Sequence, residues 1–464
     1  MDDHLPGALR KVDLYVVSCA TMLYFLSFLD RSNIGNARVA GLQQDLKMSD
    51  HQYSLALTVT YIPYMLWELP SNLLLKRLSP RILLPAYVFL WGVVTTLQGL
   101  VTTYSGLLAC RFFLGLFEGG LLPGILLYLS SFYPRHKLQL RVAVVFCATS
   151  LAGAFSGLLA AAILNMDGIR GKRGWAWIFI LEGIFTALYA LVSYFFIPAS
   201  PLTAKFLTEA ERRALHTELQ KDGSGDEEHE VFSWSAVASA FVAPQVLILA
   251  VAFFFNGTTL FGLAYFAPSI VNSLGYSPIR TQLMTVPPYA CSFVVNIFTS
   301  FLSDRYRQRG IFLVLLNLLA AIGYAMFLGS EKSHVLYAAL FFQVTGVYGS
   351  APTVSTWNTN NVMPHYKRAT AIAIAFTMTN LGGILSTWIF TSPPRYTIAT
   401  RINLAFSLGV AAAGVANVLY LRNQHAKKAA LLATSDGYSE GMGRDGPRNQ
   451  RKLGDRHPRF SYTL

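Results

Sequence analysis

Residues 134–157 read PRHKLQLRVAVVFCATSLAGAFSG, and residues 364–387 read PHYKRATAIAIAFTMTNLGGILST. Both stretches begin with Pro and a basic turn and continue into a long apolar run. Aligned without a gap, they share eight residues: Pro134/Pro364, Lys137/Lys367, Ala143/Ala373, Phe146/Phe376, Thr149/Thr379, Leu151/Leu381, Gly153/Gly383 and Ser156/Ser386. An internal repeat of this kind indicates a chain built from two copies of one helical unit.

The repeated stretches belong to a series of apolar runs, each about as long as a membrane-spanning helix, which needs roughly 20 residues. The 464 residues are 53% hydrophobic and only 13% charged, and the mean hydropathy is +0.42. A soluble domain carries about 25% charged residues. We therefore predict an all-α membrane protein with twelve transmembrane helices, at about 12–36, 52–75, 82–103, 105–132, 138–165, 175–197, 244–272, 281–303, 310–329, 333–362, 367–391 and 401–421.

The repeat pairs the fifth span with the eleventh, so the twelve helices divide into two six-helix halves. Such halves commonly hold a substrate site between them near the middle of the membrane. In the polar insert between the halves, Thr208 and Glu211 form a capping-box pattern that predicts a short helix to about Gln220. This insert is either a gate or partner site, or a plain tether. The expected organisation is an N-terminus (1–11), a first half (12–197), a linker (198–243), a second half (244–421) and a disordered tail (422–464).

The distribution of Lys and Arg predicts that both termini lie in the cytoplasm. With the N-terminus inside, the inner loops, the linker and the tail hold most of the basic residues outside the spans, as the positive-inside rule requires. The outer loop at 170–173 runs against this bias. The net charge of +13 follows from these short basic loops and the tail, so we expect contact with a lipid bilayer and no binding of nucleic acid.

Several kinds of chemistry find no support in the sequence. All nine histidines lie in loops, tails or span ends, which excludes a histidine proton relay within the membrane. We expect no metal, no cofactor and no enzymatic activity, because the spans contain no metal-ligand spacing and no nucleophile motif. The four cysteines lie inside apolar runs, which favours inert buried thiols over disulfides: Cys19, Cys110, Cys147 and Cys291.

Charged residues inside the bilayer are costly and are therefore candidates for function. Arg111 and Glu118 lie seven residues apart on the fourth span, so they face the same way at a separation of about 10 Å along the helix axis. Asp30 and Arg31 are adjacent on the first span and diverge by about 100°. We expect Arg31 and Arg111 to bind a substrate carboxylate, and Asp30 and Glu118 to carry protons. The alternative is that these four residues form two ion pairs that only hold the first and fourth spans together.

Arginine suits an anion site because it stays charged and binds a carboxylate bidentately. An anion arriving at Arg111 would weaken the effect of that arginine on Glu118, which would then bind a proton more readily. Asn380 in the eleventh span, aligned with Ser150 in the repeat, either binds substrate or forms a hydrogen bond between helices. For Glu68 and Glu182, anchoring or a gate contact is the preferred interpretation.

The loop between the eighth and ninth spans contains Asp304 and Arg305, followed by further arginines. A short basic turn lies at the matching position between the second and third spans. We expect Asp304 and Arg305 to form a conformational latch, in which the acid pairs with an arginine or a helix end in one state and releases it in another. Topological anchoring explains the arginines equally well.

At these residues the chain resembles the major facilitator superfamily. The loop at Asp304–Arg305 is similar to the second copy of the family motif G-x-x-x-D-R-x-G-R-R, with Ser300 in place of the first glycine. The first copy departs more, with Lys76 where the acid is expected. This lysine, together with LSPR at 78–81, is similar to the fungal allantoate-permease-like branch of the anion:cation symporter family. Similar stretches cover about residues 12 to 421: LDRSNIGNA at 29–37, ELPSN at 68–72, RFFLG at 111–115 with Glu118, LEG at 181–183, TVPPY at 285–289 and WNTNN at 357–361.

The resemblance implies a twelve-helix facilitator fold with rocking halves and uptake of carboxylates such as vitamins or ureides, usually driven by protons. In bacterial sugar-acid members, the positions that match Asp30, Arg31, Arg111 and Glu118 form the anion and proton sites. We therefore expect a monomeric transporter of a small organic anion with proton symport, in the plasma membrane or an organelle membrane. Two alternatives are an exporter or facilitator of a secondary metabolite on the same fold, and a receptor or scaffold that no longer transports.

Overall fold

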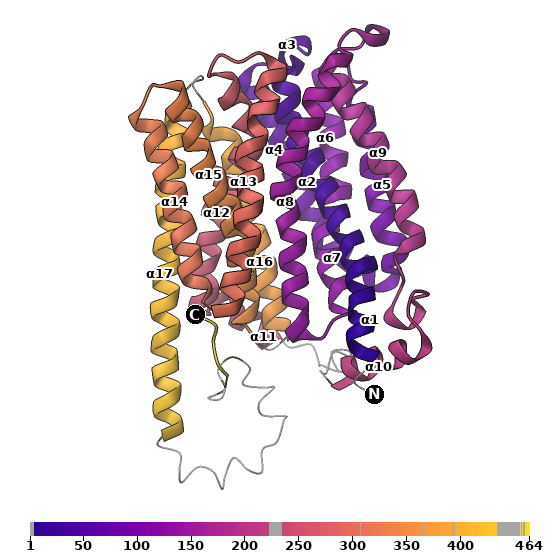
Figure 1. Cartoon of the computed structure of the whole chain (residues 1–464), viewed down its shortest axis with the longest axis vertical. Helices are drawn as coiled ribbons and strands as arrows, with labels where there is room; N and C mark the ends of the chain where they lie inside the picture. The colour runs from indigo at the N-terminus through magenta and orange to yellow at the C-terminus, as the bar shows by residue number, and fades with distance from the viewer. Residues whose placement is uncertain are drawn as a thin grey trace.

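The protein folds into two bundles of long helices that stand side by side (Figure 1). The computed structural model describes residues 4–221, 234–306, 308–363, 365–391, 393, 395–433, 455, 457 and 460–464. The first bundle holds α1 (Leu5–Val12), a π-helical turn (Asp13–Val17), α2 (Ser18–Val39), α4 (Asp50–Arg77), α5 (Pro80–Gln98), α6 (Tyr104–Glu118), α7 (Leu121–Ser130), α8 (Arg135–Ile163) and α9 (Gly174–Phe196). The second holds α12 (Pro244–Asn272), α13 (Pro278–Tyr306), α14 (Arg309–Gly329), α15 (Ser333–Asn360), α16 (His365–Ile389) and α17 (Thr397–Ala433).

These helices confirm the twelve-helix fold. Within the described residues, ten helical segments are long and apolar enough to cross a membrane. The other two, α4 and α15, are each 28 residues long and carry polar side chains along their length. Two predicted boundaries need correction. The first helix begins at Leu5 and continues through the π-turn into α2, and the fourth span is divided into α6 and α7 at Gly119 and Gly120.

The two halves meet through α8 against α13, α4 against α16 and α2 against α12. The repeat found in the sequence has a structural reason at this interface. Gly153 on α8 lies against the ring of Tyr289, and its partner in the repeat, Gly383 on α16, lies against the ring of Tyr61. A Cβ atom at either glycine would come within 2.5–2.6 Å of the ring, so only glycine lets each half accept a tyrosine of the other.

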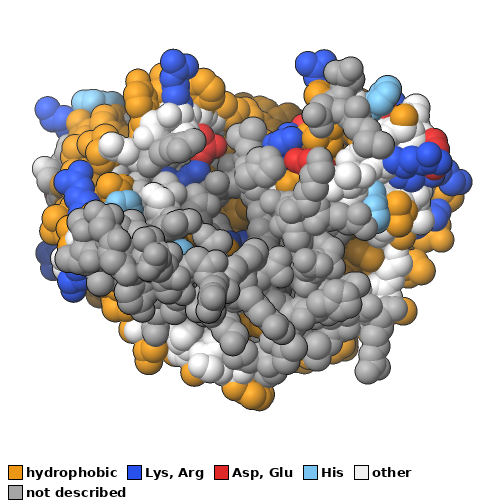
Figure 2. All heavy atoms as spheres, turned by 90° about the horizontal axis from the view of Figure 1, so that it is seen from below, with side chains coloured by type: hydrophobic (Ala, Val, Ile, Leu, Met, Phe, Trp, Pro, Cys, Tyr) orange, Lys and Arg blue, Asp and Glu red, His pale blue; other side chains and the backbone are white. Residues whose placement is uncertain are grey.

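The two ends of the bundle differ. The short helix α3 (Leu42–Asp45) marks one end, called here the α3 end, and both chain termini lie at the other, called here the terminal end (Figure 1). Lys and Arg side chains gather on both sides of the terminal end (Figure 2). The linker helices α10 (Glu209–Lys221) and α11 (Trp234–Phe241) lie at this end too.

The capping box predicted for the linker is present at the start of α10. The Thr208 backbone N–H donates to Glu211 Oε2 at 2.9 Å, and the Glu211 N–H donates to Thr208 Oγ1 at 3.4 Å. Lys11 of α1 donates to the same carboxylate at 2.8 Å. This ammonium group, followed by the capping contacts, lowers the pKa of Glu211. The linker is thus attached to the first helix through a charged contact between Lys11 and Glu211.

The tail differs from the disordered segment predicted for 422–464. The last helix continues to Ala433, because the residues after Asn423 keep strong helix formers such as Ala, Lys and Leu. Residues 434–454, 456 and 458–459 lie outside the described residues. Beyond them, Asp455 is buried and forms an ion pair of 2.7 Å with Lys367 of α16. Four further contacts join this segment to the terminal end: Gln245 to Asp455, Lys428 to the Phe460 carbonyl, and Trp357 and Asn361 to the Thr463 carbonyl.

Candidate functional site

The central helix of the first half is α2, in which every residue from Leu26 to Ala37 is buried. It packs against α8 and α9 of its own half and against α12 of the other half. This stretch includes Asp30 and Arg31 as well as several small polar residues. Because buried charge is unfavourable unless it is paired or hydrogen-bonded, the contacts of these side chains indicate what the site can do.

Arg31 forms an ion pair with Glu118 across the contact between α2 and α6. Its Nη2 donates to Glu118 Oε1 at 2.6 Å, and Ser27 Oγ donates to the same oxygen at 2.5 Å. The guanidinium group also lies 5.0 Å from the ring centre of Tyr64 and 5.2 Å from that of Phe261 on α12. Arg31 therefore lies where the two halves meet, held by a carboxylate and by aromatic rings from both halves.

Glu118 is the last residue of α6, directly before the break at Gly119 and Gly120. Both glycines are in close contact with neighbouring helices. A Cβ atom at Gly119 would lie 2.5 Å from the Tyr64 carbonyl oxygen, and one at Gly120 would lie 2.0 Å from Ser71 Oγ. The fourth span is thus interrupted directly beside the carboxylate, at a point where α4 approaches closely.

Arg111 is the second arginine that we expected to bind substrate, and only 2% of it is exposed. Neither its Nε nor its Nη2 donates to any group among the described residues. The phenol groups of Tyr53 and Tyr265 and the Glu118 carboxyl group lie within electrostatic range. Sequence spacing correctly places Arg111 and Glu118 on one helix, but the carboxylate is paired with Arg31 and leaves Arg111 with free donors.

Asp30 turns away from the two arginines. Its Oδ2 accepts hydrogen bonds from Trp91 Nε1 at 2.9 Å and from Thr186 Oγ1 at 3.1 Å, so the carboxyl group lies between α5 and α9. The divergence of about 100° between adjacent helical residues explains why Asp30 and Arg31 face different neighbours. Of the two ion pairs considered from the sequence, the one between Arg31 and Glu118 forms, and Asp30 forms none with the described residues.

A second polar network on α2 includes Glu182, for which the sequence indicated an anchoring or gate role. Asn33 Nδ2 donates to Glu182 Oε2 at 2.5 Å. Ser156 of α8 donates to Asn33 at 3.3 Å and accepts from Asn36 at 2.5 Å. This network joins α2, α8 and α9 within the first half.

The two halves are joined near the α3 end by hydrogen bonds between side chains. Tyr61 and Tyr265 share a hydrogen bond of 2.8 Å, as do Thr58 and Thr387. Gln282 donates to the Asn36 carbonyl at 3.2 Å. A Cβ atom at Gly35 would lie 2.5 Å from the Tyr265 carbonyl oxygen. These contacts close the interface from the α3 end down to the level of Tyr61. Tyr265, which takes part in this closure, lies within electrostatic range of Arg111.

Asn380 is buried on α16, three residues before Gly383, which packs against Tyr61. The neighbouring Gly382 allows α16 to approach α12, since its Cβ atom would lie 2.3 Å from the Phe254 carbonyl oxygen. Asn380 makes no hydrogen bond to either arginine within the described part of the chain. The structure therefore places it on the interface helix, apart from the charged group.

Asp304, which the sequence predicts to form a latch with Arg305, pairs with another arginine. Asp304 at the end of α13 pairs with Arg309, the first residue of α14, which also donates to Thr356 at 2.9 Å. Arg305 is exposed. It directly follows Asp304 on the same helix and therefore points elsewhere, whereas the turn brings Arg309 back to the carboxylate.

Sequence reasoning missed the aromatic and hydroxyl groups around the arginines, namely Ser27, Tyr61, Tyr64, Phe261 and Tyr265. Tyrosines inside apolar spans are a usable signal, because a buried phenol needs a hydrogen-bond partner. The spacing of single residues does not show that Tyr61 and Tyr265 come from different halves.

Comparison with known proteins agrees with this architecture. The family model of the Major Facilitator Superfamily matches residues 20–387. An uncharacterized transporter of Schizosaccharomyces pombe is 36% identical over 458 residues, covering 98% of this chain and 90% of its own. A high-affinity nicotinic acid transporter of Saccharomyces cerevisiae is 33% identical over 471 residues, with 99% and 87% covered.

Solved structures show the same fold. A D-xylose–proton symporter superposes with a TM-score of 0.66 at 18% identity, covering 86% of this chain and 96% of its own. A bacterial homologue of the human lysosomal transporter Spinster, in an inward-facing and unoccupied conformation, gives a TM-score of 0.65 at 17% identity, covering 88% and 94%. The matched relatives are transporters rather than enzymes. The chain therefore belongs to the major facilitator superfamily and is a multi-pass membrane protein that acts as a secondary transporter.

Proposed function

We propose that this transporter carries a small organic anion with a carboxylate group, together with protons. The observation that supports the proposal most directly is Arg111, a buried guanidinium group with two nitrogen donors that have no partner among the described residues and with Tyr265 of the other half in electrostatic range. An arginine cannot lose its charge in a protein. A carboxylate that accepts from Nε and Nη2 would satisfy both donors in the bidentate geometry that this side chain favours.

The arrangement of Arg31 and Glu118 supports coupling to protons. In the structure Glu118 neutralises Arg31 through a contact of 2.6 Å. A proton on Glu118 would remove that negative charge and free Arg31 to attract the incoming anion. Substrate and proton would then load together, because each compensates for the charge that the other disturbs.

The closed α3 end agrees with a carrier that presents its site alternately to the two sides of the membrane. The basic terminal end supports a cytoplasmic location for both termini. We propose a monomer in the plasma membrane, in a conformation closed toward the outside. The relative named as a nicotinic acid transporter supports an organic acid as cargo, and supports the resemblance to the anion:cation symporter family.

Uptake into proteoliposomes tests the proposal. Radiolabelled nicotinate and other monocarboxylates are compared with uncharged amides of the same skeleton, with and without an inward proton gradient. We expect saturable uptake of at least one acid that the gradient stimulates, and no uptake of its amide. Uptake of the amide at the same rate, or acid uptake that ignores the gradient, would contradict the proposal.

A further inference from the structure

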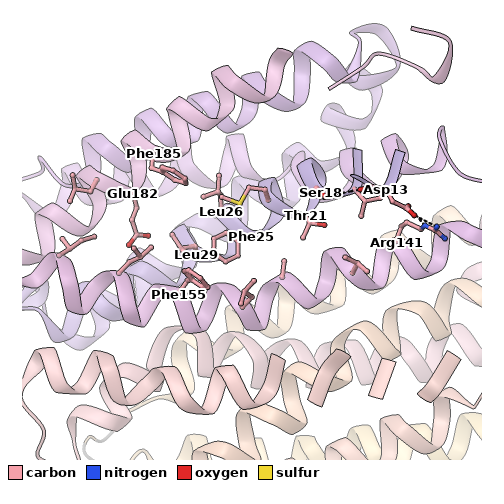
Figure 3. A pocket seen from close by; sticks show the side chains of 18 residues that line it. Asp13, Ser18, Thr21, Phe25, Leu26, Leu29, Arg141, Phe155, Glu182 and Phe185 are labelled. Carbon is pink, nitrogen blue, oxygen red and sulfur yellow. Dashed lines mark hydrogen bonds and ion pairs between the residues drawn. The ribbon is translucent and has the colours of Figure 1, made fainter. Parts of the chain in front are cut away.

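A cavity on the flank of the first half lies apart from Arg31 and Arg111. It has a volume of about 1000 Å3 and is bordered by α2, α8 and α9, and its lining includes neither Arg31, Arg111 nor Glu118. Figure 3 shows side chains of the three helices converging on it. The lining is apolar over most of its length, and Asp13 and Arg141 form an ion pair of 2.8 Å at one end.

The cavity is open to the side of the bundle. Three of its lining residues, Val144, Phe155 and Phe185, are 45%, 44% and 52% exposed. In a helix bundle that spans a membrane, such a flank faces lipid. A molecule dissolved in the bilayer can therefore reach this groove without passing through the interface between the halves.

One carboxyl oxygen deep in the groove lacks a hydrogen-bond partner among the described residues. Glu182 is 5% exposed and lines the cavity, and its Oε2 accepts from Asn33. Its Oε1 is buried and accepts no hydrogen bond from the described residues. Figure 3 shows the carboxyl group directed from its helix into the space beside Leu29 and Phe155.

A second carboxyl group, that of Asp30, lies behind this wall. Thr186 of α9 donates a hydrogen bond to Asp30, and Asn33 of α2 donates one to Glu182. Since Asp30 and Asn33, like Glu182 and Thr186, are three to four residues apart on their helices, the two carboxyl groups lie about one helical turn apart along the contact of α2 and α9. Each has one buried oxygen without a partner among the described residues, Oδ1 of Asp30 and Oε1 of Glu182, and neither forms an ion pair there. A buried carboxyl group that lacks a counter-ion can either bind a proton or pair with a cation, so an incoming ammonium group would supply the charge that the site lacks.

The groove also offers aromatic surface beside the acid. The rings of Phe25 and Phe155 meet edge to face with centres 5.7 Å apart, and Phe185 follows Glu182 by about one turn on α9. Aromatic faces attract organic cations, and they do so more strongly when water is excluded. The site thus combines a free carboxyl oxygen with aromatic and aliphatic walls.

We propose that this groove is a lateral binding site for a lipophilic amine that enters from the bilayer. The ammonium group donates to Glu182 Oε1, and the apolar part lies between Phe25, Phe155 and Phe185. This site is separate from the anion site at Arg111 and has the opposite charge preference. It would let amphiphilic amines bind the transporter without competing directly for the arginine.

Photolabelling of the full chain in phosphatidylcholine nanodiscs tests this inference. The probes are a dodecylamine with a diazirine in its chain and the alcohol of the same length. In the unmodified protein we expect saturable labelling of α2 and α8 peptides by the amine, with an affinity at least about tenfold higher than that of the alcohol.

Two variants and one control complete the design. Glu182→Gln keeps an acceptor for Asn33 and should abolish the preference for the amine. Leu159→Trp should reduce labelling by both probes, because it fills the groove without touching the acid. Glu68→Gln is the control, because it removes a carboxyl group outside the groove. This variant should be labelled to the same extent as the unmodified protein. Two results would overturn the proposal. One is equal affinity for the amine and the alcohol, which would indicate a groove for lipid chains only. The other is unchanged amine labelling in Glu182→Gln.

Discussion

Because Arg31 and Glu118 form a buried ion pair, we predict that replacing Glu118 lowers the folding stability more than replacing Arg31 does. The side chains are 9% and 3% exposed, and the contact distance is 2.6 Å. In Glu118→Gln the guanidinium group keeps its charge and loses its counter-ion. Removing one partner of a buried pair in this way costs about 3–5 kcal/mol of folding stability.

The reverse substitution is expected to be milder. In Arg31→Met the remaining Glu118 can bind a proton and become neutral, and methionine preserves the apolar contact with Tyr64 and Phe261. The expected loss is about 1–3 kcal/mol, from the charged hydrogen bonds that disappear. The double variant Arg31→Met/Glu118→Gln should be more stable than Glu118→Gln alone by about 2 kcal/mol, because it buries no unpaired charge.

The assay is denaturant unfolding of the purified proteins in one detergent, followed by intrinsic fluorescence. Glu209→Gln on α10 serves as a control, because this carboxyl group is 64% exposed and its removal should shift stability by less than about 0.5 kcal/mol. Strictly additive losses in the double variant, or a Glu118→Gln protein as stable as the unmodified one, would refute the reasoning.

Three further predictions concern other parts of the bundle. Gly115→Val should prevent folding or membrane insertion, because its Cβ atom would lie 2.0 Å from a backbone oxygen of α4; protein yield and size-exclusion profile check this. Arg309→Gln should reduce transport rate while Arg305→Gln leaves it unchanged, because Arg309 pairs with Asp304, the acid of the proposed latch, whereas Arg305 is exposed; uptake kinetics compare them. Asp455→Ala should lower the melting temperature by several degrees, because Lys367 is then left buried and unpaired, and similar melting of variant and unmodified protein would contradict this.

Much of the fold could be predicted from the sequence because the bilayer restricts the choices. Apolar runs of sufficient length must form helices, and the repeat at 134–157 and 364–387 identifies two equivalent halves. The break at Gly119 and Gly120 escaped prediction because the run stays apolar across it. It depends on the close approach of Tyr64 and Ser71, which only the tertiary structure shows.

The sequence predicted which charged residues form the candidate site, but it did not predict which of them pair with one another. Charge inside the membrane singled out Arg31, Arg111 and Glu118, and spacing gave the shared face of α6. Spacing does not show which helix lies opposite, so it could not reveal that Glu118 pairs with Arg31 and leaves Arg111 with free donors. The docked segment around Asp455 was missed for a similar reason, since its contacts join residues far apart in sequence.

The proposed role of Arg111 as the anchor for a carboxylate is tested most directly by substrate binding to the purified protein. Isothermal titration with a transported acid is compared between the unmodified protein, Arg111→Gln and Arg305→Gln, the last being a matched loss of an exposed arginine. We predict that Arg111→Gln weakens binding at least about 100-fold, since a buried charge-assisted contact of this kind contributes roughly 3 kcal/mol. Binding of the acid by Arg111→Gln within a factor of about three of the unmodified protein would contradict the assignment.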